Sequence, residues 1–177
     1  MKKILLIILL IPLQSYAKNI SDFDIERISI GDSALQFINE ENLLALQTKS
    51  EKNAEYKESV FIPNNKEAEY SMISIAYKNN DRDFIIESIE AYINYKKDFK
   101  NCLIKKKDII NTVSNLDKEV EWITKNYEDD KIKSYFTYAI FKTRHIMMLY
   151  CNDYLNSTDD YFSVYIRTID YHLWKNN

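Results

Sequence analysis

The stretch Phe23-Asp-Ile-Glu-Arg-Ile-Ser-Ile-Gly-Asp-Ser-Ala-Leu35 holds the only glycine of the 177-residue chain. Isoleucines alternate with polar residues in it, which predicts a short extended segment over 28–30. Gly31 permits a backbone conformation that a β-carbon would penalise. Asp32 and Ser33 are favourable helix N-caps, and a glutamine stands three residues after Ser33, as in a capping box. The stretch therefore predicts an extended run that turns at Gly31 and enters a helix.

The same helix start has a functional alternative. The N-terminus of a helix suits a bound anion, because its backbone N–H groups are unpaired. A phosphate-cradling loop is rich in glycine, however, and this stretch has one. We therefore interpret Gly31, Asp32 and Ser33 as a structural turn and cap, with an anion site as the alternative.

The first 17 residues have the pattern of a secretory signal peptide. Lys2-Lys3 gives a positive start, an apolar run follows over 4–13, and Ser15-Tyr16-Ala17 places small residues at a cleavage site. The apolar run is too short to favour a membrane-spanning helix. We expect a cut near Ala17, a bacterial periplasmic or secreted location, and a single mature domain over 18–177 without a membrane span.

The composition is that of one globular domain. Hydrophobic residues make up 46% of the chain and charged residues 29%, which is enough for one core. The net charge of -3 is mild and no basic stripe is present, so the sequence argues against nucleic acid as a partner.

Cys102 and Cys151 are the only cysteines. In an oxidising compartment an even pair is most simply a disulfide. Two buried thiols and a redox pair are the alternatives, although the wide spacing does not resemble the Cys-x-x-Cys of redox enzymes. A disulfide closing about fifty residues would stabilise the fold by roughly 4 kcal/mol in the loop-entropy model.

Hydrophobic periodicity predicts the remaining elements. Alternating apolar residues predict six strands, over 56–62, 69–77, 84–95, 134–142, 145–151 and 161–166. Asparagine turns at 64–65 and 79–80 separate the first three. Apolar residues at three- and four-residue steps from Phe99 to Ile123 predict one long helix capped by Asp98. Thr168 is expected to cap a short helix at the C-terminus.

The order of these elements predicts the α+β class. We expect two layers, in which antiparallel sheet from two three-strand meanders packs against the long helix, with short helices near each end. A bridge between Cys102 in the helix and Cys151 at a strand end would fasten the two layers together.

Three segments resemble small exported proteins of unassigned function from AT-rich marine bacteria. The segments are Phe23–Leu35, Asn101–Ile110, and Tyr150–Tyr154 followed by Ser163–Thr168. A glycine often stands in that group where Arg27 stands here. The resemblance implies a signal peptide and paired cysteines, and it implies no activity.

A shorter segment resembles a second group. Ile28-Ser-Ile-Gly-Asp-Ser33 is similar to the Ile-x-x-Gly-Met-Ser/Thr opening of β-lactamase-inhibitor-protein-like and outer-membrane-assembly lipoprotein modules, with Asp32 in place of the methionine. Those modules bind other proteins, so this resemblance implies a protein partner.

Patterns that carry catalysis or bind metals are scarce. His145 and His172 are the only histidines, and neither a Gly-x-Ser-x-Gly motif nor a zinc-ligand spacing is present. The acidic pairs at 129–130 and 159–160 offer oxygen ligands for calcium but lack the Asp-x-Asp-x-Asp-Gly pattern, and we interpret them as solvated turns. The sequence therefore predicts no cofactor and no metal.

Tyrosine is unusually frequent, with 14 in the chain. It offers a large contact surface with a polar tip, although strands also favour it for structural reasons. We therefore predict a non-catalytic binding or interaction module of the cell envelope, with a protein or a glycan as partner. The alternative is an envelope hydrolase that acts on a polymer and uses His145 or a carboxylate pair.

Overall fold

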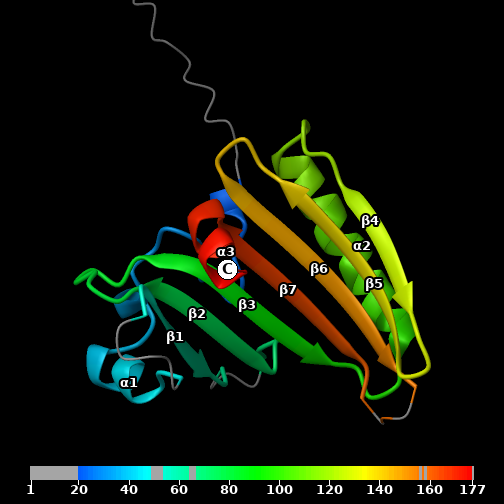
Figure 1. Ribbon diagram of the computed structural model, residues 1–177, viewed down its shortest axis with the longest axis horizontal. Helices are drawn as coiled ribbons and strands as arrows, with labels where there is room; N and C mark the ends of the chain where they lie inside the picture. The colour runs from blue at the N-terminus through cyan, green and yellow to red at the C-terminus, as the bar shows by residue number, and fades with distance from the viewer. Residues whose placement is uncertain (1–19, 49–53, 64–66, 156, 158, 177) are drawn as a thin grey trace, which may run out of the picture.

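The computed structural model describes residues 20–48, 54–63, 67–155, 157 and 159–176. The expected signal peptide with its cleavage site, and the turn at 64–65, lie outside the described residues. The described strands form one antiparallel sheet with helices on both faces (Figure 1). The strands are β1 (Tyr56–Phe61), β2 (Met72–Lys78), β3 (Ile86–Asn94), β4 (Ile123–Glu128), β5 (Ile132–Ile140), β6 (His145–Tyr154) and β7 (Tyr161–Thr168).

The described helices are short, apart from α2. They are α1 (Glu40–Ala45), α2 (Phe99–Leu116) and α3 (Ile169–Lys175), preceded by two 3₁₀ turns at Ile20–Asp22 and Ala34–Gln36. None of these helices is long and apolar enough to cross a membrane. α2 begins after Asp98, whose side chain accepts a hydrogen bond from the Asn101 N–H.

The class and the antiparallel pairing agree with the sequence, but the predicted strand count is wrong. The strand order is β1-β2-β3-β7-β6-β5-β4, so a three-strand and a four-strand meander join through β3 and β7 in one sheet. The missed strand is β4. Its first residue, Ile123, continues the apolar spacing of the helix by coincidence, although α2 ends at Leu116. β4 carries few apolar residues, because all six of its residues are exposed.

The opening stretch forms turns rather than a strand. Ile25 and Ile28 make an isolated bridge around Glu26 and Arg27, which have φ angles of 53° and 70°. Two central residues with positive φ are typical of a type I′ turn, where glycine is favoured at the second position. That preference explains why a glycine would suit the position of Arg27, where the small exported proteins that the sequence resembles often have one.

Gly31 lies where the chain reaches the start of β3. Its N–H donates to the Ile86 carbonyl over 3.0 Å, and the Ile86 N–H donates back to Asp32 over 2.9 Å. Gly31 has a φ of +90°, as the turn requires. Ser33 caps a short 3₁₀ turn instead of the predicted helix, and α1 begins only after a second cap at Asn39.

The core fills the space between the sheet and α2. β3 and β7 contribute facing pairs of buried residues, Ile89 with Ile166 and Ala91 with Val164. The expected disulfide is present, with the Sγ atoms of Cys102 on α2 and Cys151 on β6 2.11 Å apart. It fastens the helix layer to the sheet.

One lysine of α2 also faces this core. Lys106 is buried, and its Nζ donates to the Tyr135 carbonyl over 3.1 Å. Burial lowers the pKa of Lys106. This hydrogen bond satisfies a polar group that the helical stripe places inside.

We predict that Gly31→Ala lowers the free energy of unfolding by about 1–2 kcal/mol, because an L-residue pays for the left-handed conformation. No atom lies within 4 Å of the added β-carbon, so any loss of stability reports the cost of the backbone conformation and not a steric clash. Urea unfolding of the purified protein measures it. Arg27→Gly is the matched control and should not destabilise, since it relieves the same strain. An unchanged midpoint for Gly31→Ala would contradict the interpretation.

We predict that replacing both Cys102 and Cys151 by serine lowers the free energy of unfolding by about 4 kcal/mol in the loop-entropy model. The two residues are 49 positions apart in the chain. Urea unfolding should give the same loss for the double variant and for reduced wild-type protein. Two free thiols in the non-reduced protein, counted by mass spectrometry, would contradict the disulfide.

Candidate binding surface

The two faces of the sheet differ in how far they are covered. α2 and the N-terminal segment cover one face, whereas α3 covers one end of the other (Figure 1). α3 is held there by Tyr171 and Trp174, whose ring centroids lie 5.1 and 5.0 Å from that of Tyr56 on β1. We call the remainder of this second side, from β3 across to β4, the aromatic face.

A continuous row of aromatic side chains crosses the aromatic face. Successive ring centroids lie between 4.5 and 6.1 Å apart, and the row passes over β3, β7, β6 and β5. The row consists of Tyr92, Tyr165, Tyr150, Phe136 and Tyr138. Each ring is partly exposed. The strands thus hold a rigid apolar surface with polar tips at the protein exterior.

Within this row, the rings on β5 and β6 are stacked. Phe136 lies 4.5 Å from Tyr150 at an interplanar angle of 17°, and 5.2 Å from Tyr138 at 16°. The ammonium group of Lys125 lies 5.9 Å from the centroid of Tyr138. On β5 and β6, ring faces therefore meet each other and Lys125, which leaves ring edges as the main exposed parts of these rings.

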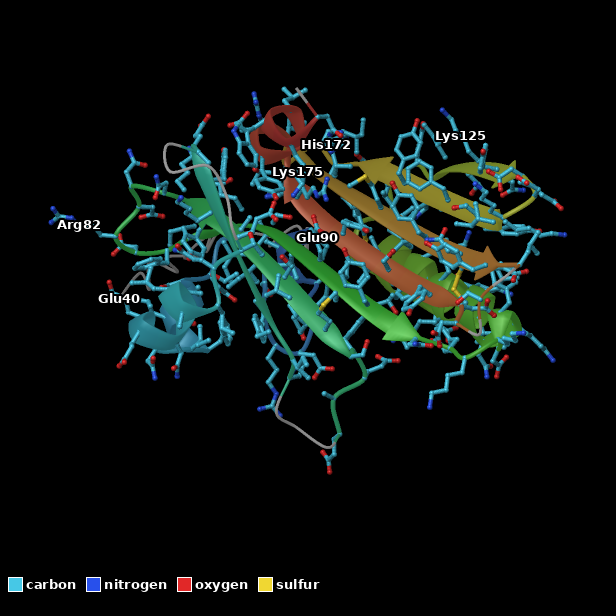
Figure 2. All side chains as sticks on the ribbon, turned by 60° about the horizontal axis from the view of Figure 1, so that its bottom comes forward. Glu40, Arg82, Glu90, Lys125, His172 and Lys175 are labelled. Carbon is cyan, nitrogen blue, oxygen red and sulfur yellow. A yellow bond between two sulfur atoms is a disulfide. The ribbon has the colours of Figure 1, made fainter. Side chains whose placement is uncertain are left out.

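An apolar hollow of about 250 Å³ adjoins the row. Ile140, Ile146 and Met148 line it beside two rings of the row, together with Lys125 and His172. Ile140 is 60% exposed. In Figure 2, His172 lies on α3 and Lys125 on β4 at the outer edge of the sheet. An exposed apolar patch of this kind is typical of an interaction surface.

A buried ion pair lies between the row and α3. Arg167 of β7 pairs with Glu90 of β3, and Arg167 is only 7% exposed. The guanidinium carbon lies 4.9 Å from the ring of Tyr165 and 5.6 Å from that of Tyr171. Tyr92 donates its hydroxyl proton to Glu90 over 3.1 Å. Burial raises the pKa of Tyr92, so its hydroxyl remains a donor at neutral pH.

A second charged group fixes α3 to the first strand. Glu58 of β1 accepts hydrogen bonds from the Tyr171 hydroxyl and from Lys175 (Figure 2 labels Lys175). Burial alone would raise the pKa of Glu58, but the bonds from Lys175 and Tyr171 outweigh it and lower the pKa. The Glu58 carboxylate is therefore ionised at neutral pH and stabilises the packing of α3.

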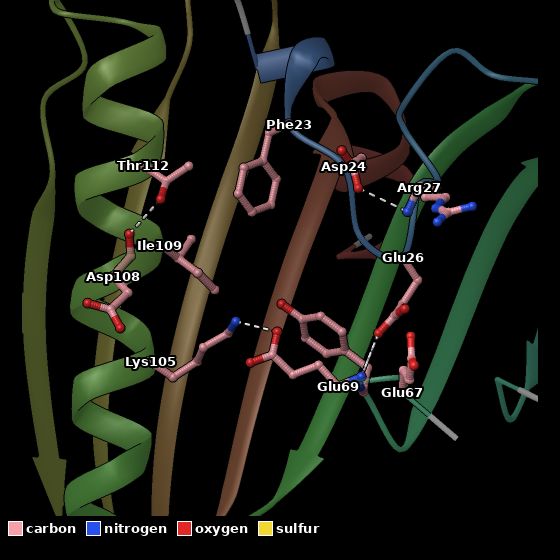
Figure 3. Close-up of a pocket in the computed structure, with 11 residues that line it drawn as sticks. Phe23, Asp24, Glu26, Arg27, Glu67, Glu69, Lys105, Asp108, Ile109 and Thr112 are labelled. Atoms are coloured by element: carbon pink, nitrogen blue, oxygen red, sulfur yellow. Dashed lines mark hydrogen bonds and ion pairs between the residues drawn. The ribbon is translucent and has the colours of Figure 1, made fainter. Parts of the chain in front are cut away.

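A hollow of about 440 Å³ lies on the other side of the sheet, between α2 and the N-terminal segment (Figure 3). One ion pair and two hydrogen bonds to backbone N–H groups engage several of its charged side chains. Glu26 accepts from the Glu69 N–H over 2.7 Å, Lys105 pairs with Glu69, and Asp24 accepts from the Arg27 N–H. Glu69 thus links the N-terminal segment to α2, and we assign this hollow a structural role.

The histidines of the alternative hydrolase do not form a catalytic arrangement. His145 Nδ1 lies 3.0 Å from Thr143 Oγ1, whereas His172 lies on α3. Burial lowers the pKa of both, so both are neutral at pH 7. Cys102 and Cys151 are bonded to each other and are not nucleophiles.

One carboxyl group does have a perturbed pKa. Asp160 is buried, and its pKa is raised by burial and by the nearby Asp153. Neither residue lines the two hollows described above. Asp160 therefore has one property of a general acid but adjoins neither of these hollows.

The sequence also suggested an anion site near Gly31 and a calcium site at the acidic pairs. The Gly31 N–H donates to the Ile86 carbonyl in β3 and the Ala34 N–H to the Phe84 carbonyl before it, so they are not free for an anion. The Asp129 carboxylate accepts from the Lys131 and Ile132 N–H groups, as in a turn. The described residues contain no group of three or more His, Cys, Asp or Glu side chains placed to hold a metal.

Comparison with known proteins adds no relative. No family model, no curated protein and no solved structure matches the chain. Both resemblances drawn from the sequence stay predictions, and the functional argument depends on the surface itself.

We predict that Glu58→Gln lowers the free energy of unfolding at neutral pH by about 1 kcal/mol, since charge-assisted hydrogen bonds to α3 are lost. The folded pKa of Glu58 lies below its ordinary value of 4.5. The contribution is therefore complete above that pH and disappears as pH falls through the folded pKa. Urea unfolding across this range should show wild type and variant converging in acid.

Glu55→Gln is the control, because Glu55 is exposed and directly precedes β1. Its unfolding should match that of wild type over the whole pH range. A constant difference between wild type and Glu58→Gln at all pH values would contradict the role of the carboxylate.

Proposed function

We propose that the chain is an exported, non-catalytic binding module of the bacterial cell envelope, and that the aromatic face is its contact surface. The observation that carries the proposal is the row of partly exposed rings, which adjoins an apolar hollow on the side of the sheet that α3 leaves open. The signal-peptide pattern over 1–17 and the disulfide support an oxidising location.

A protein partner suits this surface better than a glycan. Sugar rings pack their C–H groups onto open aromatic faces, but Phe136 and Tyr138 stack on each other and Lys125 lies over Tyr138. Ring edges, hydroxyl groups and the exposed Ile140 suit the mixed apolar and polar side chains of another protein. Aromatic residues are also those most often found at energetic hot spots of protein interfaces.

The rigidity of the row favours binding over catalysis. Its rings stand on four neighbouring strands, and the Arg167–Glu90 pair is buried among them. A preorganised surface loses little conformational entropy when a partner binds. Sites of catalysis instead need a nucleophile or a paired acid and base next to a cavity.

We predict that Ile140→Lys weakens partner binding by at least about tenfold, because it buries a charge against apolar groups at the interface. The immobilised wild-type chain should retain one saturable protein from an envelope extract of the source cells, and the variant should not. Quantitative mass spectrometry of the retained proteins measures the difference.

Ile104→Lys is the matched control. Ile104 is an isoleucine of similar exposure, 47%, but it lies on α2 behind the sheet. It should retain the partner as wild type does, and both variants should unfold at the wild-type urea midpoint. Equal retention by all three chains, or retention lost only for Ile104→Lys, would overturn the proposal.

A further inference from the structure

The two edges of the sheet are not protected equally. At the β1 edge, the segment Leu46–Thr48 covers the strand, since the Thr48 N–H donates to Glu58 and the Val60 N–H donates to Leu46. At the opposite edge, all residues of β4 are exposed, and no backbone hydrogen bond from elsewhere in the described chain reaches its outer side. Figure 1 shows β4 as the outermost strand. An unprotected edge is a template for another strand.

The register of β4 identifies the backbone groups that face outward. Asp129 donates its N–H to the Ile132 carbonyl at the end of the hairpin, so these two residues form a hydrogen-bonded pair. Hydrogen-bonded and non-hydrogen-bonded pairs alternate along an antiparallel ladder. By this alternation the N–H and C=O groups of Thr124, Asn126 and Glu128 face away from β5.

A side-chain contact agrees with this assignment. The hydroxyls of Thr124 and Thr137 lie 3.0 Å apart across the β4–β5 ladder. Side chains approach most closely at non-hydrogen-bonded pairs. Six outward groups on three alternate residues are therefore left for a partner strand.

We propose that β4 is a dimerisation edge, at which two copies of the chain pair their β4 strands antiparallel about a two-fold axis through Asn126. In this register Asn126 lies opposite Asn126 of the second copy, and Thr124 lies opposite Glu128 at both ends. All three outward residues then form hydrogen-bonded pairs, with six backbone hydrogen bonds in total.

Side-chain charge favours this register over the one shifted by two residues towards the N-terminus of β4. Lys125 lies opposite Tyr127 of the second copy, where an ammonium and an aromatic ring attract each other. That shift would set Lys125 opposite Lys125 of the second copy and leave Glu128 without a partner in β4. Like charges directly opposite each other are unfavourable. A lysine often protects an edge strand, but here its ammonium lies over Tyr138 on the aromatic face.

The dimer has a consequence for the sheet faces. Residues that pair across an antiparallel ladder point to the same side. The two sheets therefore join with both aromatic faces on one side. The inference stands independently of the proposed function, because it depends only on β4 and its register.

Sedimentation equilibrium of the mature protein tests the pairing. We expect a reversible dimer for wild type and a monomer for Asn126→Pro, which removes an outward N–H from each copy and leaves the bonds to β5 intact. Asn126→Ser is the control and should dimerise. A monomeric wild type at the highest soluble concentration would overturn the inference, as would an Asn126→Pro dimer of wild-type affinity.

A charge-swap experiment separates pairing from a folding defect. Asn126→Lys and Asn126→Asp each place like charges on the axis and should each weaken the homodimer by up to about fivefold. Mixing the two variants should restore association as a heterodimer at low salt. Failure of the mixture to associate more tightly than either variant alone would overturn the proposed axis.

Discussion

The pairing of β3 with β7 is the contact on which the rest of the structure depends. These strands are far apart in the sequence, and each belongs to a different meander. Their facing residues on the α2 side, such as Ala91 with Val164, are fully buried. A slip of one residue would turn every such pair to the other face. The burial of these pairs therefore fixes one register, and that register merges the meanders into one sheet.

The same register builds the aromatic face on the reverse side. Glu90 lies opposite Tyr165 and next to Arg167, so the ion pair and the tyrosine contacts follow from the core pairing. A buried ion pair adds little net stability once desolvation is counted, but breaking it leaves a buried charge. We interpret the Glu90–Arg167 pair as a feature that keeps the tyrosines in one arrangement between β3 and α3.

The sequence predicts much of the fold and little of the site. The alternation over 161–166 places Phe162, Val164 and Ile166 on one side, as observed, because hydrophobic burial enforces a period of two. The bulge at Ala76/Tyr77 is not visible in that pattern, and it shifts the register so that Ile86 and Ile89, three residues apart, are both buried. Which face stays open depends on where the helices pack. That is set by tertiary contacts such as Tyr171 with Tyr56, which no local pattern encodes.

The central claim is that the aromatic face, and not the α2 face, meets the partner. Site-specific photo-crosslinking in intact cells tests it most directly, with a benzophenone amino acid at Tyr138 on the aromatic face or at the exposed Asn111 on α2. The account predicts one discrete protein adduct from position 138 and none from position 111. An adduct from position 111, with none from position 138, would contradict it.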